Sequence, residues 1–312
     1  PNGWRWNDGM KGRKGSTDEG GVRSPLIIQW KSKIPGGKKV LHIASAIDLL
    51  PTLCDLASIP SETPKVIDGK SLKPLLLEKD PEWPERLIIN HWRGRTSIRS
   101  QEFRLDFENK LFNMVNDPGQ FNDISTELPE IHDQMVLAKV AWEKEVLPEL
   151  PLEDKRTFPL GHPDFKYTPI PARDGTAHGN IIRSNRYPNC SFFTNWIDPE
   201  DKITWEVEVV ADGDFKVVIY YTCPENDIGS NFSVTLNDSK LNGQIQEAHD
   251  PPLFGMEEDR DERIESYVKD FRPLELGMIS LKKGKGTLTL QADQIPGSQV
   301  MDFRLMMFER MD

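Results

Sequence analysis

The chain has 312 residues, of which 37% are hydrophobic and 29% charged, and its formal net charge is −11. This length is enough for two domains. The acidic balance argues against nucleic acid as a partner, because phosphate backbones are bound by clustered lysine and arginine. No apolar run approaches the roughly 20 residues that a membrane-spanning helix needs, so the sequence predicts no membrane span.

The first informative stretch covers residues 11–25 and reads Lys-Gly-Arg-Lys-Gly-Ser-Thr-Asp-Glu-Gly-Gly-Val-Arg-Ser-Pro. Lys11, Arg13 and Lys14 place three cations within four positions, and glycines beside them let the backbone bend closely. Lysine offers a compact charge that suits the oxygens of a tetrahedral anion. Clustered cations beside glycines suit an anion cradle. The alternative is an ordinary solvated loop, but the whole string, leading into apolar residues 26–30, favours an anion site.

The next elements follow in chain order. Residues 22–30 are short and apolar and predict a buried strand. Residues 45–57 carry apolar side chains at helical spacing, and Pro51 indicates that this helix either begins near Asp48 or bends at the proline. Residues 86–113 alternate short apolar runs with turns and predict a small antiparallel sheet. Residues 128–147 show apolar positions three and four apart, typical of an amphipathic helix that packs on that sheet.

The second half of the chain has a different pattern. Residues 148–172 are rich in proline and charge, and we interpret 151–172 as a linker. Many short alternating segments with intervening glycines follow, and they predict an all-β sandwich over residues 173–312. Trp196, Trp205, Tyr220 and Tyr221 are candidates for a glycan-binding face, although aromatic residues usually fill the core of a sandwich.

Three strings in the first half resemble one family. Lys-Gly-Ser-Thr-Asp-Glu-Gly-Gly-Val-Arg, starting at Lys14, resembles the lysine motif of the sulfatases in the alkaline-phosphatase-like superfamily. Asp-Leu-Leu-Pro-Thr-Leu from Asp48 resembles the helix that follows that motif in sulfatases. Asp-Gly-Lys-Ser-Leu-Lys-Pro-Leu-Leu from Asp68 resembles the turn after it. The resemblance is specific over residues 1–145. Beyond them the chain is loosely similar to β-sandwich modules appended to some bacterial sulfatases.

The resemblance implies a fold class and a division into domains. It implies α/β for residues 1–150, as the C-terminal part of the sulfatase fold with a small antiparallel subdomain, followed by the linker and the all-β sandwich. The sequence has no initiator Met and no signal peptide, and we expect it to be a fragment. A periplasmic or extracellular location is expected from the family alone.

The resemblance also implies the site. Lys14 is expected to be the catalytic residue that binds a sulfate oxygen, whereas Glu19 and Arg23 are expected to orient the turn by pairing locally. His91 and Arg93 lie in a predicted loop of the subdomain and are candidates for contacts with substrate. Sulfatases also use a formylglycine nucleophile and a calcium ion, and we expect both the nucleophile and the calcium ligands to lie outside this chain, so no residue here is assigned to a metal.

The predicted function is therefore hydrolysis of sulfate esters by the whole enzyme, with a sulfated carbohydrate or an aryl sulfate as substrate and no activity of this fragment alone. One alternative is a phosphate or phosphonate ester hydrolase of the same superfamily. Another is a carbohydrate-binding protein without catalysis. The sequence leaves open the sugar, the oligomeric state, and whether Cys190 pairs with Cys223.

Overall fold

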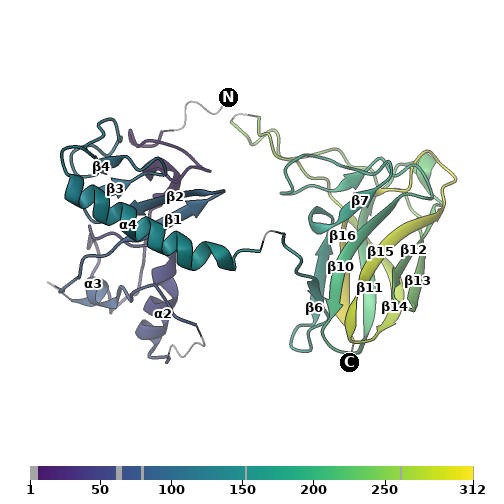
Figure 1. Ribbon diagram of the computed structural model, residues 1–312. Coiled ribbons are helices and arrows are strands. Elements are labelled where there is room, and N and C mark those ends of the chain that lie inside the picture. Colours follow the sequence, from purple (N-terminus) through teal and green to yellow (C-terminus); the bar gives the residue numbers. More distant parts are fainter. Residues whose placement is uncertain (1–5, 61–64, 79–80, 152, 261, 312) are drawn as a thin grey trace. The chain divides into compact units, whose positions relative to one another are not determined.

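The computed structural model describes residues 6–60, 65–78, 81–151, 153–260 and 262–311. The chain divides into two compact units, residues 1–152 and 153–312 (Figure 1). None of the described helices is both long enough and apolar enough to cross a membrane.

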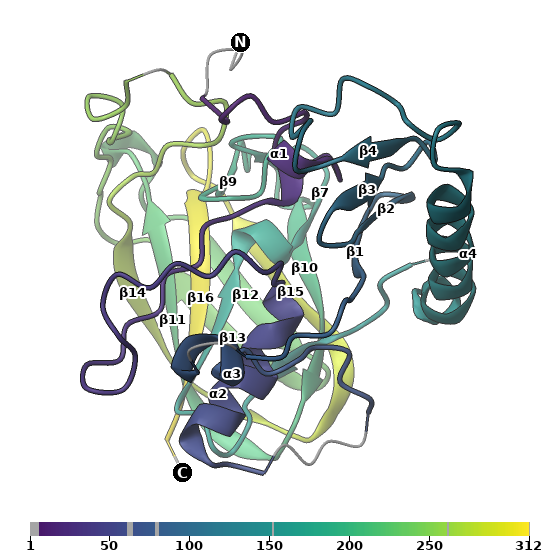
Figure 2. The same cartoon turned by 90° about the vertical axis from the view of Figure 1, so that its left-hand side faces the viewer.

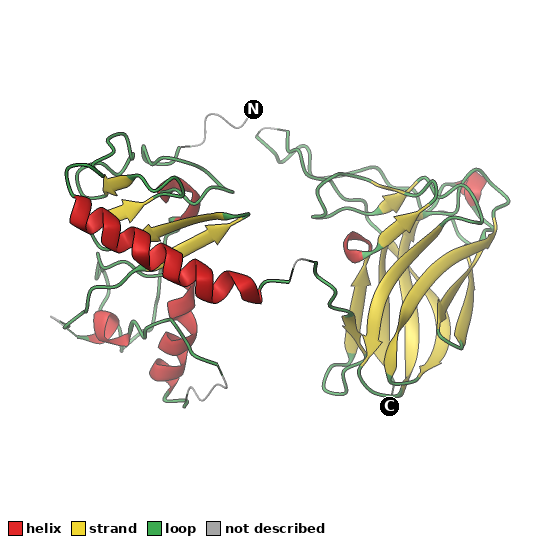
Figure 3. Cartoon of the chain, in the orientation of Figure 1, coloured by secondary structure: helices red, strands yellow, loops and turns green. Residues whose placement is uncertain are grey.

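The first unit contains a four-stranded antiparallel sheet in the order β1-β2-β3-β4, as the sequence predicts. A long helix, α4, lies along this sheet (Figure 3). Met135 of α4 is buried with Ile98, Leu105 and Leu111 of the sheet, which explains the apolar stripe on the helix. The elements of this unit are α1 (Glu19–Val22), η1 (Ala46–Asp48), α2 (Leu49–Ala57), α3 (Lys73–Leu77), β1 (Ile88–Trp92), β2 (Arg95–Arg99), β3 (Phe103–Leu105), β4 (Leu111–Asn113), α4 (Pro129–Val146) and η2 (Leu147–Glu149).

The helix predicted over residues 45–57 is formed by η1 and α2. Ser45 donates its backbone N–H to the Asp48 carboxylate at 2.8 Å, which caps the start. Pro51 falls in the first turn of α2, where its missing N–H costs no hydrogen bond. Of the two alternatives that Pro51 left open, the α-helix that begins just after Asp48 is therefore the one that the structure has.

The buried strand predicted over residues 22–30 is wrong. Glu19–Val22 is a single helical turn, and residues 24–30 form no strand. Figure 2 shows this purple segment as an extended trace outside the small sheet. Leu26, Ile27 and Trp30 are exposed, with Ile27 at 90%. An apolar run becomes a buried strand only when a neighbouring strand pairs with it, and among the described residues this segment has no such neighbour.

The second unit is a β-sandwich of two six-stranded sheets. One sheet has the order β13-β12-β15-β10-β5 with β7 also on β10, and the other has the order β14-β11-β16-β9-β8 with β6 also on β16. The strands are β5 (Phe158–Leu160), β6 (Tyr167–Pro171), β7 (Thr176–His178), β8 (Ile182–Arg183), β9 (Phe193–Thr194), β10 (Lys202–Val209), β11 (Gly213–Thr222), β12 (Asn231–Leu236), β13 (Ser239–Gln244), β14 (Arg272–Leu281), β15 (Gly284–Gln294) and β16 (Asp302–Arg310); the short helices are η3 (Ala172–Asp174) and η4 (Glu225–Asp227).

Alternation along the strands determines the core of the sandwich. Trp205 on β10 and Tyr221 on β11 point inward and are buried, and Trp196 is buried with them. The Trp205 indole N–H donates to the carbonyl of Pro171 at 3.1 Å, so its polar edge is satisfied. These three aromatic residues are therefore core, and of the four candidates for a glycan-binding face only Tyr220 lies outside it.

Two further expectations need correction. Residues 158–160 and 167–171, expected to belong to a linker, are strands β5 and β6 of the sandwich. Both lie where prolines are tolerated, since an edge strand does not need every N–H. Among the described residues the sheets are antiparallel except for the β5–β10 pair, so the α/β class is not confirmed, and the chain is mostly antiparallel sheet with few helices.

The cysteines form no disulfide. Cys190 is exposed and Cys223 is buried, and both are free thiols. Burial is the main reason that the pKa of the Cys223 thiol is raised to about 12, so this group is an unreactive core thiol.

Candidate functional site

The turn that carries Lys14 is tight and ordered. Ser16 donates its backbone N–H to the carbonyl of Arg13 at 2.9 Å, and Ser16 Oγ accepts from the Arg13 N–H at 3.2 Å. Gly15 has φ of +90°, a conformation that suits glycine. Lys14 is exposed, and no hydrogen-bond or ion-pair partner of its ammonium lies within the described residues. The turn therefore presents a cation that the fold itself does not neutralise.

Glu19 fixes this turn to the small sheet. Its buried carboxylate lies 2.7 Å from an Arg104 nitrogen on β3 and 3.5 Å from Arg99 Nε on β2. Burial lowers the pKa of the Arg104 guanidinium, and the neighbouring Glu19 charge opposes that effect. Arg23 approaches the same carboxylate at 3.8 Å, as the sequence suggests. Glu19 is thus the centre of a three-arginine cluster, of which only the local member was predicted.

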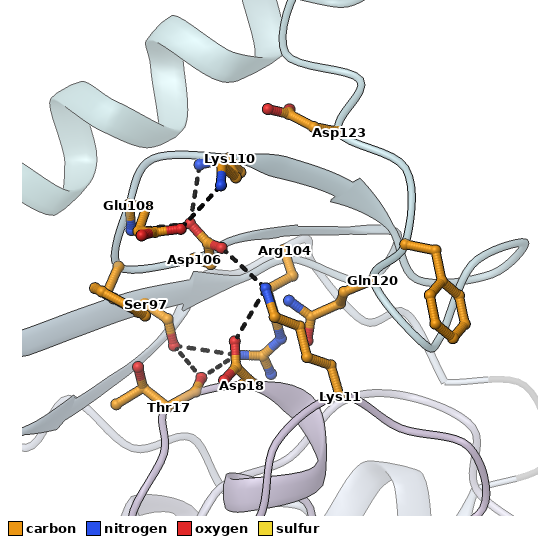
Figure 4. A network of polar contacts seen from close by, with 12 residues as sticks. Lys11, Thr17, Asp18, Ser97, Arg104, Asp106, Glu108, Lys110, Gln120 and Asp123 are labelled. Atoms are coloured by element: carbon orange, nitrogen blue, oxygen red, sulfur yellow. Dashed lines mark hydrogen bonds and ion pairs between the residues drawn. The ribbon is translucent and has the colours of Figure 1, made fainter.

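Lys11 has a different environment from Lys14. Its ammonium lies 3.4 Å from the Asp106 carboxylate and 3.8 Å from that of Asp18 (Figure 4). Asp106 also accepts the backbone N–H groups of Glu108 and Lys110, each at 2.9 Å, so it closes the turn between β3 and β4. Lys11 is therefore an internal ion-pair partner that joins the lysine turn to the sheet.

A second set of contacts in Figure 4 joins the same two segments. The carbonyl of Thr17 accepts from Ser97 Oγ at 2.7 Å and from an Arg104 nitrogen at 3.0 Å. Arg104 also donates to Ser97 Oγ at 3.1 Å. All three residues are buried, so these hydrogen bonds are shielded from water. Residues 17–19 are therefore held rigidly, and they hold the Lys14 turn in place.

The β1–β2 hairpin reaches the lysine turn. Arg93 and Gly94 both have positive φ, 48° and 77°, as a two-residue hairpin turn requires. Trp92 is 51% exposed, and its indole nitrogen lies 4.0 Å from the position that a Cβ on Gly15 would occupy. The Arg93 guanidinium lies 5.6 Å from the centre of a Trp92 ring. An aromatic surface and a second cation therefore lie beside the Lys14 turn.

His91 is held within the hairpin. Its Nε2 accepts the backbone N–H of Gly94 at 3.3 Å, which assigns the proton to Nδ1, and Nδ1 lies 2.9 Å from Thr96 Oγ1. Both ring nitrogens are thus used to shape the hairpin. Trp92 was not singled out from the sequence, although its place between the two candidate residues of the predicted loop is a signal that would have identified it.

The described residues contain no group of three or more His, Cys, Asp and Glu side chains able to hold a metal ion. The acidic residues near Lys14 already form ion pairs within the fold, since Asp18 and Asp106 pair with Lys11 and Glu19 pairs with arginines. The residues present do not fit a calcium site.

Comparisons with known proteins agree with the resemblance of the first unit to sulfatases. Residues 13–138 match the family model described as N-sulphoglucosamine sulphohydrolase, C-terminal. Over 81 residues the chain is 41% identical to human steryl-sulfatase, covering 26% of this chain and 14% of that protein. It is 38% identical over 106 residues to human arylsulfatase A, covering 30% and 19%. It is 29% identical over 145 residues to a sulfatase of Formosa agariphila, covering 39% and 26%.

Residues 13–138 are therefore identified as a C-terminal portion of a sulfatase. The chain spans about a quarter or less of the length of these three relatives. Among solved structures, a family 35 carbohydrate-binding module from Clostridium thermocellum is 13% identical, with a TM-score of 0.31, and the match covers 45% of this chain and 97% of that one.

Proposed function

We propose that the whole protein hydrolyses sulfate esters and that Lys14 contacts the sulfate group. The observation that carries this proposal is the contrast between Lys11, whose ammonium is ion-paired twice, and Lys14, which is exposed on an anchored turn without a partner in the described structure. Arg13 provides a second exposed cation one residue away. Only a cation that the fold leaves uncompensated is available to an anionic substrate.

The chemistry assigned to Lys14 is electrostatic. Cleavage of a sulfate ester develops negative charge on the leaving oxygen, and a fixed ammonium beside it stabilises that charge without reorganising. Rigidity matters here, and the buried contacts of Glu19 and Thr17 supply it. The formylglycine nucleophile and the calcium ion that the family uses would both be held by residues outside this chain.

The hairpin is proposed to contact the alcohol part of the substrate. Trp92 presents an exposed ring beside Gly15, and Arg93 adds a donor at the tip. These groups suit a sugar ring or an aryl group joined to sulfate, so a sulfated carbohydrate or an aryl sulfate is the proposed substrate. His91 acts indirectly, by holding the hairpin that carries Trp92 and Arg93. We also propose a periplasmic or extracellular location, which is expected from the resemblance to sulfatases.

The test compares two esters of the same phenol. The full-length protein is produced together with a formylglycine-generating enzyme, and hydrolysis of nitrophenyl sulfate and nitrophenyl phosphate is followed at equal enzyme concentration. The proposal expects turnover of the sulfate to exceed that of the phosphate. Preferential turnover of the phosphate contradicts it in favour of a phosphoesterase. If a folded enzyme whose nucleophile has been converted to formylglycine turns over neither these esters nor sulfated oligosaccharides, that result contradicts the proposal in favour of a non-catalytic binding protein.

A further inference from the structure

The outward face of one sandwich sheet carries rows of side chains that take no part in the core. Four strands take part, in the order β14-β11-β16-β6 (Figure 1). Their register brings outward side chains into rows across the sheet, and the rows through β11 pair Lys216 with Glu309, Val218 with Met307 and Glu275, and Tyr220 with Pro273. Tyr167 on β6 is in register with Glu309. With strands about 4.8 Å apart, this face spans about 14 Å.

A hollow of about 430 Å³ lies on this face. Part of its lining is apolar and aromatic. Tyr220 and Val218 come from β11, Met307 from β16 and Pro273 from β14, while Tyr167, 54% exposed, comes from the edge strand β6. Val218, Tyr220 and Met307 are only half-buried although their neighbours along the strands fill the core. The hollow therefore offers carbon-rich surface to a ligand without any cost to the sandwich.

The other part of the lining is a fixed ionic group. Glu309 accepts from Lys216 Nζ at 2.8 Å and from Lys166 Nζ at 3.0 Å, and the Tyr167 hydroxyl donates to it at 3.4 Å. The hydrogen bonds from Lys216 and Lys166 lower the pKa of Glu309 to about 2, so the carboxylate stays ionised. Glu275 adds a second acceptor at the rim. These groups hold their donors and acceptors in place before any ligand arrives.

We propose that this face binds a neutral oligosaccharide chain. A sugar ring has a face of C–H groups, which pack on an aromatic ring, and a rim of hydroxyls, each both donor and acceptor. The rings of Tyr220 and Tyr167 suit the C–H face of a sugar, and the ionic group around Glu309 suits its hydroxyls. A purely apolar ligand would leave the charged groups desolvated without partners.

The charge balance identifies the class of sugar. The lining contains one cation, Lys216, and two carboxylates, Glu275 and Glu309, so it carries no excess of positive charge. Lys166 pairs with Glu309 from outside the lining and brings these four groups to a sum of zero. Lys216 and Lys166 are already paired with Glu309, and they offer hydrogen bonds rather than an unpaired charge. An anionic sugar would meet two carboxylates and gain no net attraction. The site is therefore unlike the Lys14 turn, whose exposed cations suit an anion.

The test uses the complete 312-residue chain in native gels that contain a neutral β-glucan, xylan, mannan or galactan, with a sulfated galactan in a parallel gel. At least one neutral polysaccharide is expected to retard the protein, and raising the salt concentration is expected to leave the retardation unchanged because the ligand carries no charge. Calorimetry with oligosaccharides of the retained polymer then gives the affinity. Because no catalysis is involved, failure here leaves the sulfatase proposal intact, and failure of that proposal leaves this one intact.

Variants locate the binding on this face. Tyr220→Ala is expected to weaken binding by about tenfold or more, whereas Tyr220→Phe keeps the ring and stays within about threefold of the wild type. Tyr167→Ala, on an edge strand, provides a second test if Tyr220→Ala fails to fold. Tyr187→Ala is the control, because this tyrosine of the same unit does not line the hollow. Retention by the sulfated galactan alone, by none of the neutral polymers, or unchanged by both alanine variants would overturn the proposal.

Discussion

At the scale of single residues, the site separates cations that look equivalent in the sequence. Lys11, Arg13 and Lys14 lie within four positions, and the string alone does not say which of them is free. One of the two carboxylates paired with Lys11 belongs to Asp106, 95 residues further along the chain, so only the fold reveals this contact. The importance of Lys14 followed from a family resemblance, and its lack of a partner in the described structure is consistent with that role.

The Glu19 cluster gives a prediction about stability. Glu19→Gln keeps the shape of the side chain but leaves Arg104 and Arg99 without their buried counter-charge. Breaking a buried ion pair by removing one partner is expected to lower the free energy of unfolding of the first unit by about 3–5 kcal/mol. Urea titration followed by circular dichroism measures the loss. Glu108→Gln, which breaks an exposed pair with Lys110, is the control and should leave the midpoint in place.

Glu309 gives a prediction about pH. Its pKa is lowered from 4.5 to about 2 by hydrogen bonds from Lys216 and Lys166. A carboxylate with a lowered pKa in the folded state stabilises the protein above its unfolded pKa, and this stabilisation disappears as the pH falls through the folded value. Glu309→Gln should therefore destabilise the second unit at neutral pH, and the difference from wild type should shrink between pH 4.5 and about 2. A difference that does not vary over that window would contradict the assignment.

At the scale of elements, local periodicity determined what could be predicted. The helix ending at Ala57, the helix Pro129–Val146 and the four strands of the small sheet each carry their pattern within a few residues. The strand expected over residues 22–30 failed because a strand depends on a neighbour that a local pattern does not reveal. Strands β5 and β6 were missed because their own sequences carry no strand pattern. The three residues of β5 and the proline-rich five residues of β6 become strands only by pairing with β10 and β16.

Packing of α4 on the small sheet provides a matched pair of substitutions. Met135 is 3% exposed and contacts the core of the sheet, whereas Leu137 on the same helix is 69% exposed. Met135→Ala is expected to cost about 2–5 kcal/mol of unfolding free energy, since a cavity is left behind. Leu137→Ala should be close to neutral because alanine favours helix and no packing is lost. Equal effects of the two substitutions would show that α4 does not pack as described.

At the scale of the whole molecule, the two units have separate cores. The sandwich buries its own large apolar cluster, and the small sheet with α4 buries another. Independent cores predict two unfolding transitions in calorimetry of the chain. The transition assigned to the sandwich should be reproduced by residues 153–312 expressed alone. A single unfolding transition in the chain, with none in residues 153–312 alone, would contradict the division into two independently folded units.

Contact between Lys14 and the sulfate group is best tested by measuring kcat/KM of the full-length enzyme on an aryl sulfate for Lys14→Ala beside Lys33→Ala. Lys33 is also an exposed lysine of the first unit, so the pair controls for loss of surface charge. Loss of a fixed group that stabilises developing charge is expected to lower the rate by about 100- to 1,000-fold, with Lys33→Ala at the wild-type value. Wild-type turnover by a folded Lys14→Ala enzyme would contradict this contact.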